Sequence, residues 1–222
     1  MNANKICFVS CVNDEKIYQK CTSYIHNLEV PFDYEIETLA IRNAVSMTSG
    51  YNEALRQTDA KYKVYLHQDV FIMNKNFLQE ILHLFKCPKI GMIGVVGSTQ
   101  IPPSGIWWEA ESLYGKVYDS HTGVMGLLDF HEVENEYKEV QCIDGLIMIT
   151  QFDIPWREDI FTGWHFYDLS QSREFNIAGY KVVIPRQQIP WCIHDSGVAS
   201  VSGYHHYRQE FLNEYSQNNF QT

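Results

Sequence analysis

Short apolar runs alternate with helical patterns through the first hundred residues, and this alternation limits the possible fold more than any other feature. The apolar runs are residues 6–12, 34–41, 63–66 and 90–97, and the helical patterns between them are residues 13–28, 46–57 and 74–87. Strands that alternate with helices form parallel sheets covered by helices. We therefore predict an α/β fold with a doubly wound, mostly parallel sheet flanked by helices.

The ends of these helical segments carry local signals that support the assignment. Asn13 or Asp14 is placed to cap the first helix, Ser46 precedes the second, and the third stops before Pro88. Ser, Asn and Asp side chains bind the free amide groups of a helical first turn, and proline ends a helix.

The second half of the chain is less regular and predicts a mixed, antiparallel lobe built onto the α/β core. Alternating patterns at 116–130 and 131–150 fit antiparallel strands, the run 142–150 being one compact strand. A helix over 167–178 leads through Gly179 into a strand at 181–185, and a last strand ends at His194. We predict one domain over 1–222, with halves at 1–100 and 101–200 and a terminal polar helix at 201–222.

Composition excludes several classes of protein. A formal net charge of −10 argues against a general nucleic-acid binder, whose affinity comes mainly from Lys and Arg on phosphates. No apolar run approaches the length of a membrane span. The six cysteines show no zinc-binding spacing, and several lie in apolar runs, which predicts buried thiols in a reducing, cytoplasmic compartment.

Polar side chains follow the predicted strands at the points where those strands end. His67, Gln68 and Asp69 interrupt the third apolar run, and the first run leads into Ser10–Asp14. Ligands of doubly wound sheets bind at the carboxyl ends of the parallel strands. The sequence has no glycine-rich dinucleotide or phosphate-loop motif, so those two sites are not predicted. The alternatives for residues 67–69 are a simple polar bend and a ligand site at the strand tip.

The ordered motifs FVSCVNDE, SMTSGYNEAL, KYKVYLHQDVFI, CIDGLIMIT, GWHFYDLSQSREFNIAGYKVVIP and CIHDSG resemble glycosyltransferase family two. More narrowly, the chain resembles a bacterial glycosyltransferase-like subgroup in which HQD replaces the usual DxD motif. The resemblance covers roughly residues 5–198 and implies a GT-A fold. It makes 1–100 the nucleotide-binding half and 101–200 the acceptor-side half.

The resemblance also implies roles for individual residues. Asp69 matches the last carboxylate of DxD, and His194 matches a histidine that supplies a further metal ligand. The implied cofactor is Mn²⁺ or Mg²⁺, and the imidazole of His67 in place of an acid shifts the preference toward Mn²⁺. The residues implied to bind the nucleotide-sugar are Ser10, Cys11, Val12, Asn13, Ser46, Met47, Gly50, Tyr51, Asn52, His67 and Gln68.

The catalytic base is where the sequence departs from the family pattern. An inverting transfer needs a base, usually a carboxylate, for the proton of the acceptor hydroxyl. The position that is usually acidic holds Phe166, which leaves Asp168 as the first candidate and Asp144 as the second. Glu158 and Asp159 either lie on the surface or fold inward to replace the missing acids.

The implied function is a metal-dependent, inverting transfer of a sugar from a nucleoside-diphosphate-sugar, with UDP the expected nucleotide. The acceptor would be a glycan, a lipid-linked molecule or a protein, in the synthesis of a bacterial surface polysaccharide. The alternative is a non-catalytic relative that binds nucleotide-sugar or glycan; a nucleotidyltransferase would need glycines after the first strand. The expected location is the cytoplasm, with peripheral association at the inner face of the membrane left open. Trp107 and Trp108 are either a buried contact or a platform for a sugar.

Overall fold

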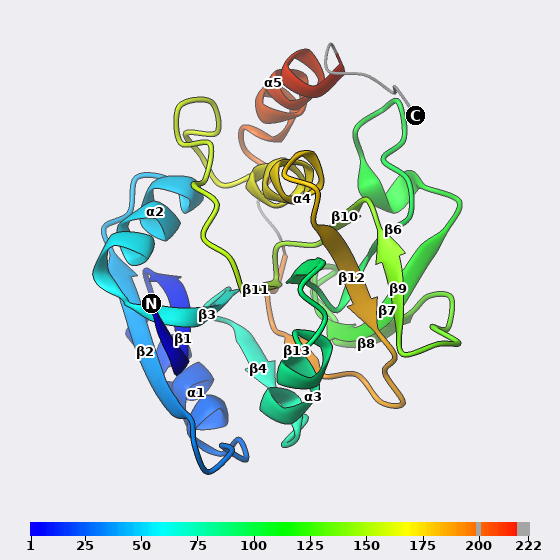
Figure 1. Ribbon diagram of the computed structural model, residues 1–222. Helices are drawn as coiled ribbons and strands as arrows, with labels where there is room; N and C mark the ends of the chain where they lie inside the picture. The colour runs from blue at the N-terminus through cyan, green and yellow to red at the C-terminus, as the bar shows by residue number, and fades with distance from the viewer. Residues whose placement is uncertain (199–200, 217–222) are drawn as a thin grey trace.

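In the computed structural model, which describes residues 1–198 and 201–216, a seven-stranded sheet forms the centre of the fold (Figure 1). The strand order is β2-β1-β3-β11-β5-β12-β9. The strands are β1 (Asn2–Val12), β2 (Glu35–Arg42), β3 (Ala60–Leu66), β5 (Ile90–Ile93), β9 (Tyr137–Val140), β11 (Ile147–Thr150) and β12 (Lys181–Pro185). β11 runs antiparallel to both β3 and β5, and β9 runs antiparallel to β12. The remaining strands are parallel, which confirms the predicted mostly parallel α/β sheet.

A second, mixed sheet has the order β10-β6-β7-β13-β4, with β8 paired to β7. Its strands are β4 (Val70–Ile72), β6 (Val96–Ser98), β7 (Leu113–Asp119), β8 (Gly126–Asp129), β10 (Cys142–Ile143) and β13 (Cys192–His194). β7 and β8 form the predicted antiparallel hairpin, whereas β13 joins β7 in parallel. The predicted mixed lobe is therefore present.

Five α-helices and one short 3₁₀ helix complete the described residues. They are α1 (Glu15–His26), α2 (Met47–Gln57), α3 (Phe77–Leu84), η1 (Trp107–Glu109), α4 (Tyr167–Ile177) and α5 (Tyr204–Ser216). Asp14 caps α1 and Ser46 caps α2, as their positions predicted. α5 lies beside α4 (Figure 1), where the hydroxyls of Ser170 and Tyr215 are hydrogen-bonded. Residues 217–222 of the predicted terminal helix lie outside the described part.

Two runs that the sequence predicted as single strands are each divided between the two sheets. Residues 90–97 split into β5 and β6, and residues 142–150 split into β10 and β11. The breaks meet: a Cβ built on Gly94 would lie 2.6 Å from the Cβ of Ile143. The second break is a turn in which Asp144 accepts a hydrogen bond from the amide of Leu146. Strands from both sides of residue 100 thus enter both sheets, and the predicted boundary there stays a prediction.

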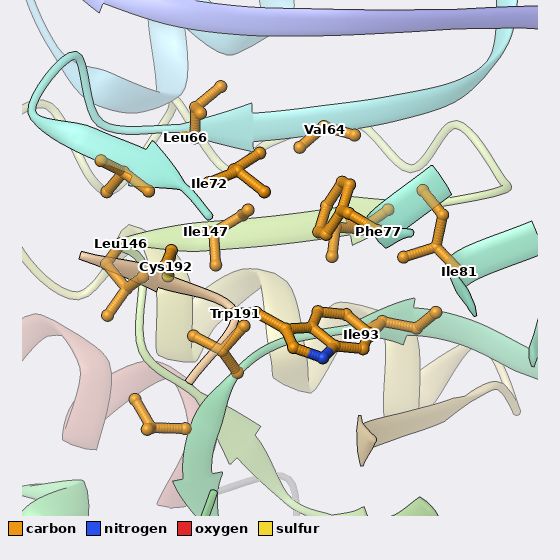
Figure 2. Packing of buried hydrophobic residues seen from close by; sticks show 14 of the residues in the cluster. Val64, Leu66, Ile72, Phe77, Ile81, Ile93, Leu146, Ile147, Trp191 and Cys192 are labelled. Atoms are coloured by element: carbon orange, nitrogen blue, oxygen red, sulfur yellow. The ribbon is translucent and has the colours of Figure 1, made fainter. Parts of the chain in front are cut away.

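The apolar core fills the space beside the central sheet. Figure 2 shows Val64 and Leu66 of β3 close to Ile147 of β11, with side chains from other elements around them. The rings of Phe77 and Trp191 meet nearly at right angles, with their centroids 5.4 Å apart. All six cysteines are free thiols, four of them buried. Among the described residues, no helix is long and apolar enough to cross a membrane.

Removing the side chain of Ile147 should test this core. Ile147 is fully buried and pairs with Leu66 at the end of β3. We expect Ile147→Ala to lower the free energy of unfolding by about 2–5 kcal/mol, because it removes apolar contacts and leaves a cavity. Ile177→Ala is the matched control, since Ile177 is 59% exposed and should change stability by less than about 0.5 kcal/mol. Urea denaturation measures both, and equal losses would contradict this placement of the core.

Candidate functional site

Several polar side chains meet at the end of the central sheet that is formed by the carboxyl termini of β1 and β3. β3 delivers His67, Gln68 and Asp69 immediately after its last residue. Because β11 runs antiparallel to β3 and pairs Ile147 with Leu66, the Asp144 turn before β11 lies at the same edge. Parallel strands present their carboxyl ends together, which explains why the motifs converge although they are distant in sequence.

His67, Asp69 and His194 form a group in which one ligand atom from each residue lies within 4.8 Å of the others. Nδ1 of His67 is 3.3 Å from Nε2 of His194, and that Nε2 is 3.6 Å from Oδ1 of Asp69. The same Oδ1 is buried and has no hydrogen-bond partner among the described residues. A buried carboxylate oxygen without a partner is costly, so it marks a place where a ligand is expected.

Two residues that the sequence analysis did not predict orient the outer nitrogens of these histidines. Oδ2 of Asp119 lies 2.7 Å from Nδ1 of His194, and the hydroxyl of Tyr167 lies 2.5 Å from Nε2 of His67. Metal-binding histidines usually donate their other ring N–H to a carboxylate or other oxygen, which fixes the ring. The only signal for Asp119 in the sequence is its place at the end of an apolar strand.

Asp119 is itself held by three hydrogen bonds. Its Oδ2 is bonded to His194, as described above. Its Oδ1 accepts a hydrogen bond of 2.7 Å from the backbone amide of His121 and lies 2.5 Å from the ring Nδ1 of His121. Burial would raise the pKa of Asp119, but the hydrogen bonds from His194 and His121 outweigh it and lower the pKa to about 2. Asp119 is therefore a carboxylate at neutral pH.

The two histidines have opposite protonation tendencies. Burial, with His194 beside it, lowers the pKa of His67. Burial would also lower the pKa of His194, but its hydrogen bond to Asp119 and the nearby charges of Asp69 and Asp144 raise it overall. The lowered pKa of His67 favours its neutral imidazole, the form that binds metals, and its Nδ1 faces Nε2 of His194.

The geometry of this group fits a divalent cation. Two ligand atoms held about 2.1 Å from one cation lie roughly 3.0–3.4 Å apart, and the separations of 3.3 and 3.6 Å are close to that range. Two imidazoles and one carboxylate suit a transition-metal ion better than Mg²⁺, which prefers oxygen ligands.

Two further carboxylates, Asp144 and Asp168, stand at the start of β11 and the start of α4. Oδ2 of Asp168 accepts a hydrogen bond of 3.0 Å from the amide of Gly145, which brings Asp168 to the Asp144 turn. Burial, together with the charge of Asp144, raises the pKa of Asp168 to about 7. Asp168 is thus able to exchange a proton near neutral pH, as a general base must.

Phe166, at the position that is usually acidic, lies at the N-cap of α4 with a left-handed backbone, φ 62°. Its ring is buried and contacts Phe211 of α5, with the centroids 5.6 Å apart. Glu158 and Asp159 are exposed, and Asp159 is paired with Arg157. These two acids therefore lie on the surface, as in the first alternative that the sequence left open.

A pocket of about 390 Å³ opens at the carboxyl ends of β1 and β2. Its volume is in the usual range for small-molecule sites. Its lining residues are Cys11, Val12, Asn13, Glu15, Ile41, Arg42, Asn43, Ala44 and Trp164. Three of the predicted nucleotide-binding residues, Cys11, Val12 and Asn13, are among them, whereas Arg42 and Trp164 were not predicted.

Gln68 connects the pocket to the metal-ligating group. Its Oε1 accepts hydrogen bonds of 3.0 Å from the amides of both Asn13 and Asp14, and its Nε2 donates to Oδ1 of Asn13. The side chain between His67 and Asp69 is therefore fastened to the end of β1. It fixes the separation between the pocket and the ligand group.

The other predicted nucleotide-binding residues make contacts within the protein. Ser10 is buried, and its hydroxyl has no hydrogen-bond partner in the described part of the chain. In α2, Ser46 caps the helix, the amide of Met47 donates to Gly163, and Asn52 exchanges hydrogen bonds with the backbone of Trp156. Gly50 packs against Cys11, and Tyr51 is fully buried. These residues hold the segment that leads to Trp164, and direct nucleotide contacts from them stay a prediction.

Comparison with known proteins identifies the family. The model described as "Glycosyltransferase like family" matches residues 7–215, so the chain belongs to this family. The streptomycin biosynthesis protein StrF of Streptomyces griseus is 24% identical over 183 residues, which are 78% of this chain and 61% of StrF.

Solved structures with the same GT-A fold include two glycosyltransferases. A mannosyltransferase, PcManGT from Pyrobaculum calidifontis in complex with GDP-Man and Mn²⁺, gives a TM-score of 0.59 at 11% identity, over 98% of this chain and 64% of that one. TarS 1–349 of S. aureus in complex with UDP gives a TM-score of 0.55 at 10% identity, over 95% of this chain and 66% of that one. The chain thus spans less than two thirds of StrF and PcManGT. The predicted fold and family are confirmed.

Asp119 should control the affinity of the site for metal. We expect Asp119→Asn to weaken Mn²⁺ binding by about 10–100-fold, because the charge that orients His194 is lost. Asp129→Asn is the matched control, since Asp129 lies on the paired strand β8 and its exposed carboxylate is paired with Lys116. Calorimetric titration with Mn²⁺ measures both variants, and equal affinities would show that Asp119 has no part in the site.

The raised pKa of Asp168 should lower the folding stability of the protein at alkaline pH. Its pKa is about 7 in the folded protein against an ordinary 3.8, so between these values the folded state keeps a proton that the unfolded chain loses. Folding stability therefore falls as pH rises through this window and stays reduced above it. We expect Asp168→Asn to raise Tm at pH 8 by at least about 2 °C and to lose this advantage toward pH 4. Calorimetric scans across pH test this, with the exposed Glu134→Gln as control; a pH-independent difference would contradict it.

Proposed function

We propose that this protein is an inverting, metal-dependent glycosyltransferase that moves a sugar from a nucleoside-diphosphate-sugar to an acceptor hydroxyl. The observation that carries this proposal is the meeting of a metal-ligating group, a carboxylate with a raised pKa and a nucleoside-sized pocket at one sheet edge. Family membership and the GT-A fold support it.

The donor would lie across this edge. Its nucleoside would occupy the pocket beside Trp164, whose exposed ring offers a stacking surface for a base. The diphosphate would extend past Asn13 and Gln68 toward His67, Asp69 and His194. A divalent cation held by these three residues would neutralise the charge that develops on the leaving diphosphate.

Asp168 would act as the general base. The acceptor oxygen forms a bond to the anomeric carbon as the bond from that carbon to the diphosphate breaks, and the acceptor proton passes to Asp168. Attack from the face opposite the leaving group inverts the configuration. A pKa of about 7 suits this task, because about half of the base is ionised at neutral pH and the ionised form accepts a proton well. Asp144 raises that pKa and remains the second candidate for the base.

The expected donor nucleotide is UDP, and the acceptor would be a glycan, a lipid-linked molecule or a protein. Two structurally similar proteins are described in complex with UDP or GDP-Man, so UDP, GDP and CDP should be compared. The alternative is a protein that binds the donor without transferring the sugar, because Phe166 stands at the position that is usually acidic.

Calorimetric titration with UDP, GDP and CDP, with and without Mn²⁺, tests the donor site. We expect one nucleotide to bind only with Mn²⁺, and Asp69→Ala to weaken that binding by at least tenfold, because the variant removes the one carboxylate ligand. Asp33→Ala, an exposed acid before β2, is the matched control and should bind as the wild type does. No binding of any nucleotide under either condition would refute the proposal.

Turnover separates an enzyme from a binding protein. A UDP-sugar that binds should be hydrolysed slowly by the wild type, and Asp168→Asn should abolish this hydrolysis while nucleotide affinity persists. Binding without release of UDP from any donor would identify the non-catalytic relative.

A further inference from the structure

An aromatic cluster joins η1 to the start of α5, and the donor site described above does not include it. Trp108 is 51% exposed, whereas its neighbour Trp107 is buried at 6%. The two rings meet edge-on at 84°, with their centroids 5.9 Å apart, so the buried ring of Trp107 packs against that of Trp108. A large aromatic ring held in place and half open to solvent is a feature of binding surfaces.

Tyr204, at the start of α5, extends this surface. Its ring centroid is 5.7 Å from that of Trp108, and the two planes are inclined by only 37°. The loop that carries Trp108 is attached to α5 at two further points: Arg208 donates a hydrogen bond to the carbonyl of Ser104, and Gly105 lies against Leu212. The two rings therefore belong to one built surface, although they are almost a hundred residues apart.

Tyr204 also connects this surface to the proposed base. Its ring contacts Phe166 and His165, with centroid separations of 5.0 and 5.4 Å, and Phe166 is two residues from Asp168. Burial raises the pKa of Tyr204, and the negative charge of Asp168 raises it further, which is consistent with their proximity. The aromatic surface thus begins at the N-terminus of α4, where the acceptor hydroxyl would have to lie.

We propose that Trp108 and Tyr204 form the subsite on which a saccharide acceptor stacks one face of its pyranose ring. This inference rests on the proposed function, and it selects a carbohydrate from the three acceptor classes left open. A pyranose presents a face of C–H groups that packs against the electron-rich face of an aromatic ring. The hydroxyls of the pyranose need polar partners. The exposed carboxylate of Glu109 follows Trp108 in sequence, and its charge raises the pKa of Tyr204, which shows that it lies near both rings.

Saturation-transfer NMR with methyl glycosides tests the subsite directly. The probes are the methyl pyranosides of glucose, galactose, mannose and N-acetylglucosamine, each measured with Mn²⁺ and UDP present and absent. We expect at least one to receive saturation at its ring C–H protons. Trp108→Ala should weaken its binding by about three- to tenfold, the range expected for one aromatic contact. Trp108→Phe should restore part of the affinity, because it keeps a flat ring.

The controls separate this inference from the proposed function. Phe32→Ala removes a fully exposed ring remote from the site and should leave glycoside binding unchanged. Trp108→Ala should bind UDP with Mn²⁺ as tightly as the wild type. If UDP binding is intact but no glycoside binds, or if Trp108→Ala binds glycosides as the wild type does, the subsite is refuted while the donor site stands. If glycosides bind at Trp108 but no nucleotide binds, the transferase proposal fails alone.

Discussion

The hydrogen bond between the hydroxyl of Tyr167 and Nε2 of His67 joins the two parts of the site. It links the first residue of α4 to the first residue after β3, and so holds the start of the helix next to the end of the strand. Around it, a single segment, residues 163–168, reaches every part of the site. Trp164 lines the pocket, Phe166 contacts Tyr204, Tyr167 orients His67, and Asp168 meets the Asp144 turn.

The left-handed backbone of Phe166 makes this arrangement possible. A φ of 62° is unfavourable for a bulky residue, by roughly 1–3 kcal/mol, and persists only where the surroundings fix it. Here the buried ring of Phe166 packs against Tyr204 and Phe211, so α5 holds the turn in place. The apolar side chain at the usually acidic position thus has a structural role. The acid nearest to it, Asp168, lies one residue inside the helix and receives the amide hydrogen bond of Gly145.

Much of the site could be predicted from sequence, because strand ends are local features and doubly wound sheets place them together. His67 and Asp69 were singled out in this way, whereas the family resemblance implied roles for His194, Asp144 and Asp168. The structure brings these side chains close together, and their roles stay predictions. Asp119 was missed because its role depends on the parallel pairing of β13 with β7, which sets it opposite His194 and leaves no local pattern. The divided strands were missed for the same kind of reason, since Gly94 breaks β5 from β6 where Ile143 packs against it.

Several features of the site lower the stability of the fold. Asp69 keeps a buried oxygen without a hydrogen-bond partner in the described structure, burial disfavours the charged form of His67, and Asp144 and Asp168 repel each other. Each of these features costs free energy of folding. Three carboxylates, those of Asp69, Asp144 and Asp168, lie at this end of the sheet, and the whole chain carries a formal charge of −10. A cation bound here would offset these penalties, so the groups that cost free energy of folding are the same ones that would favour a metal and its diphosphate ligand.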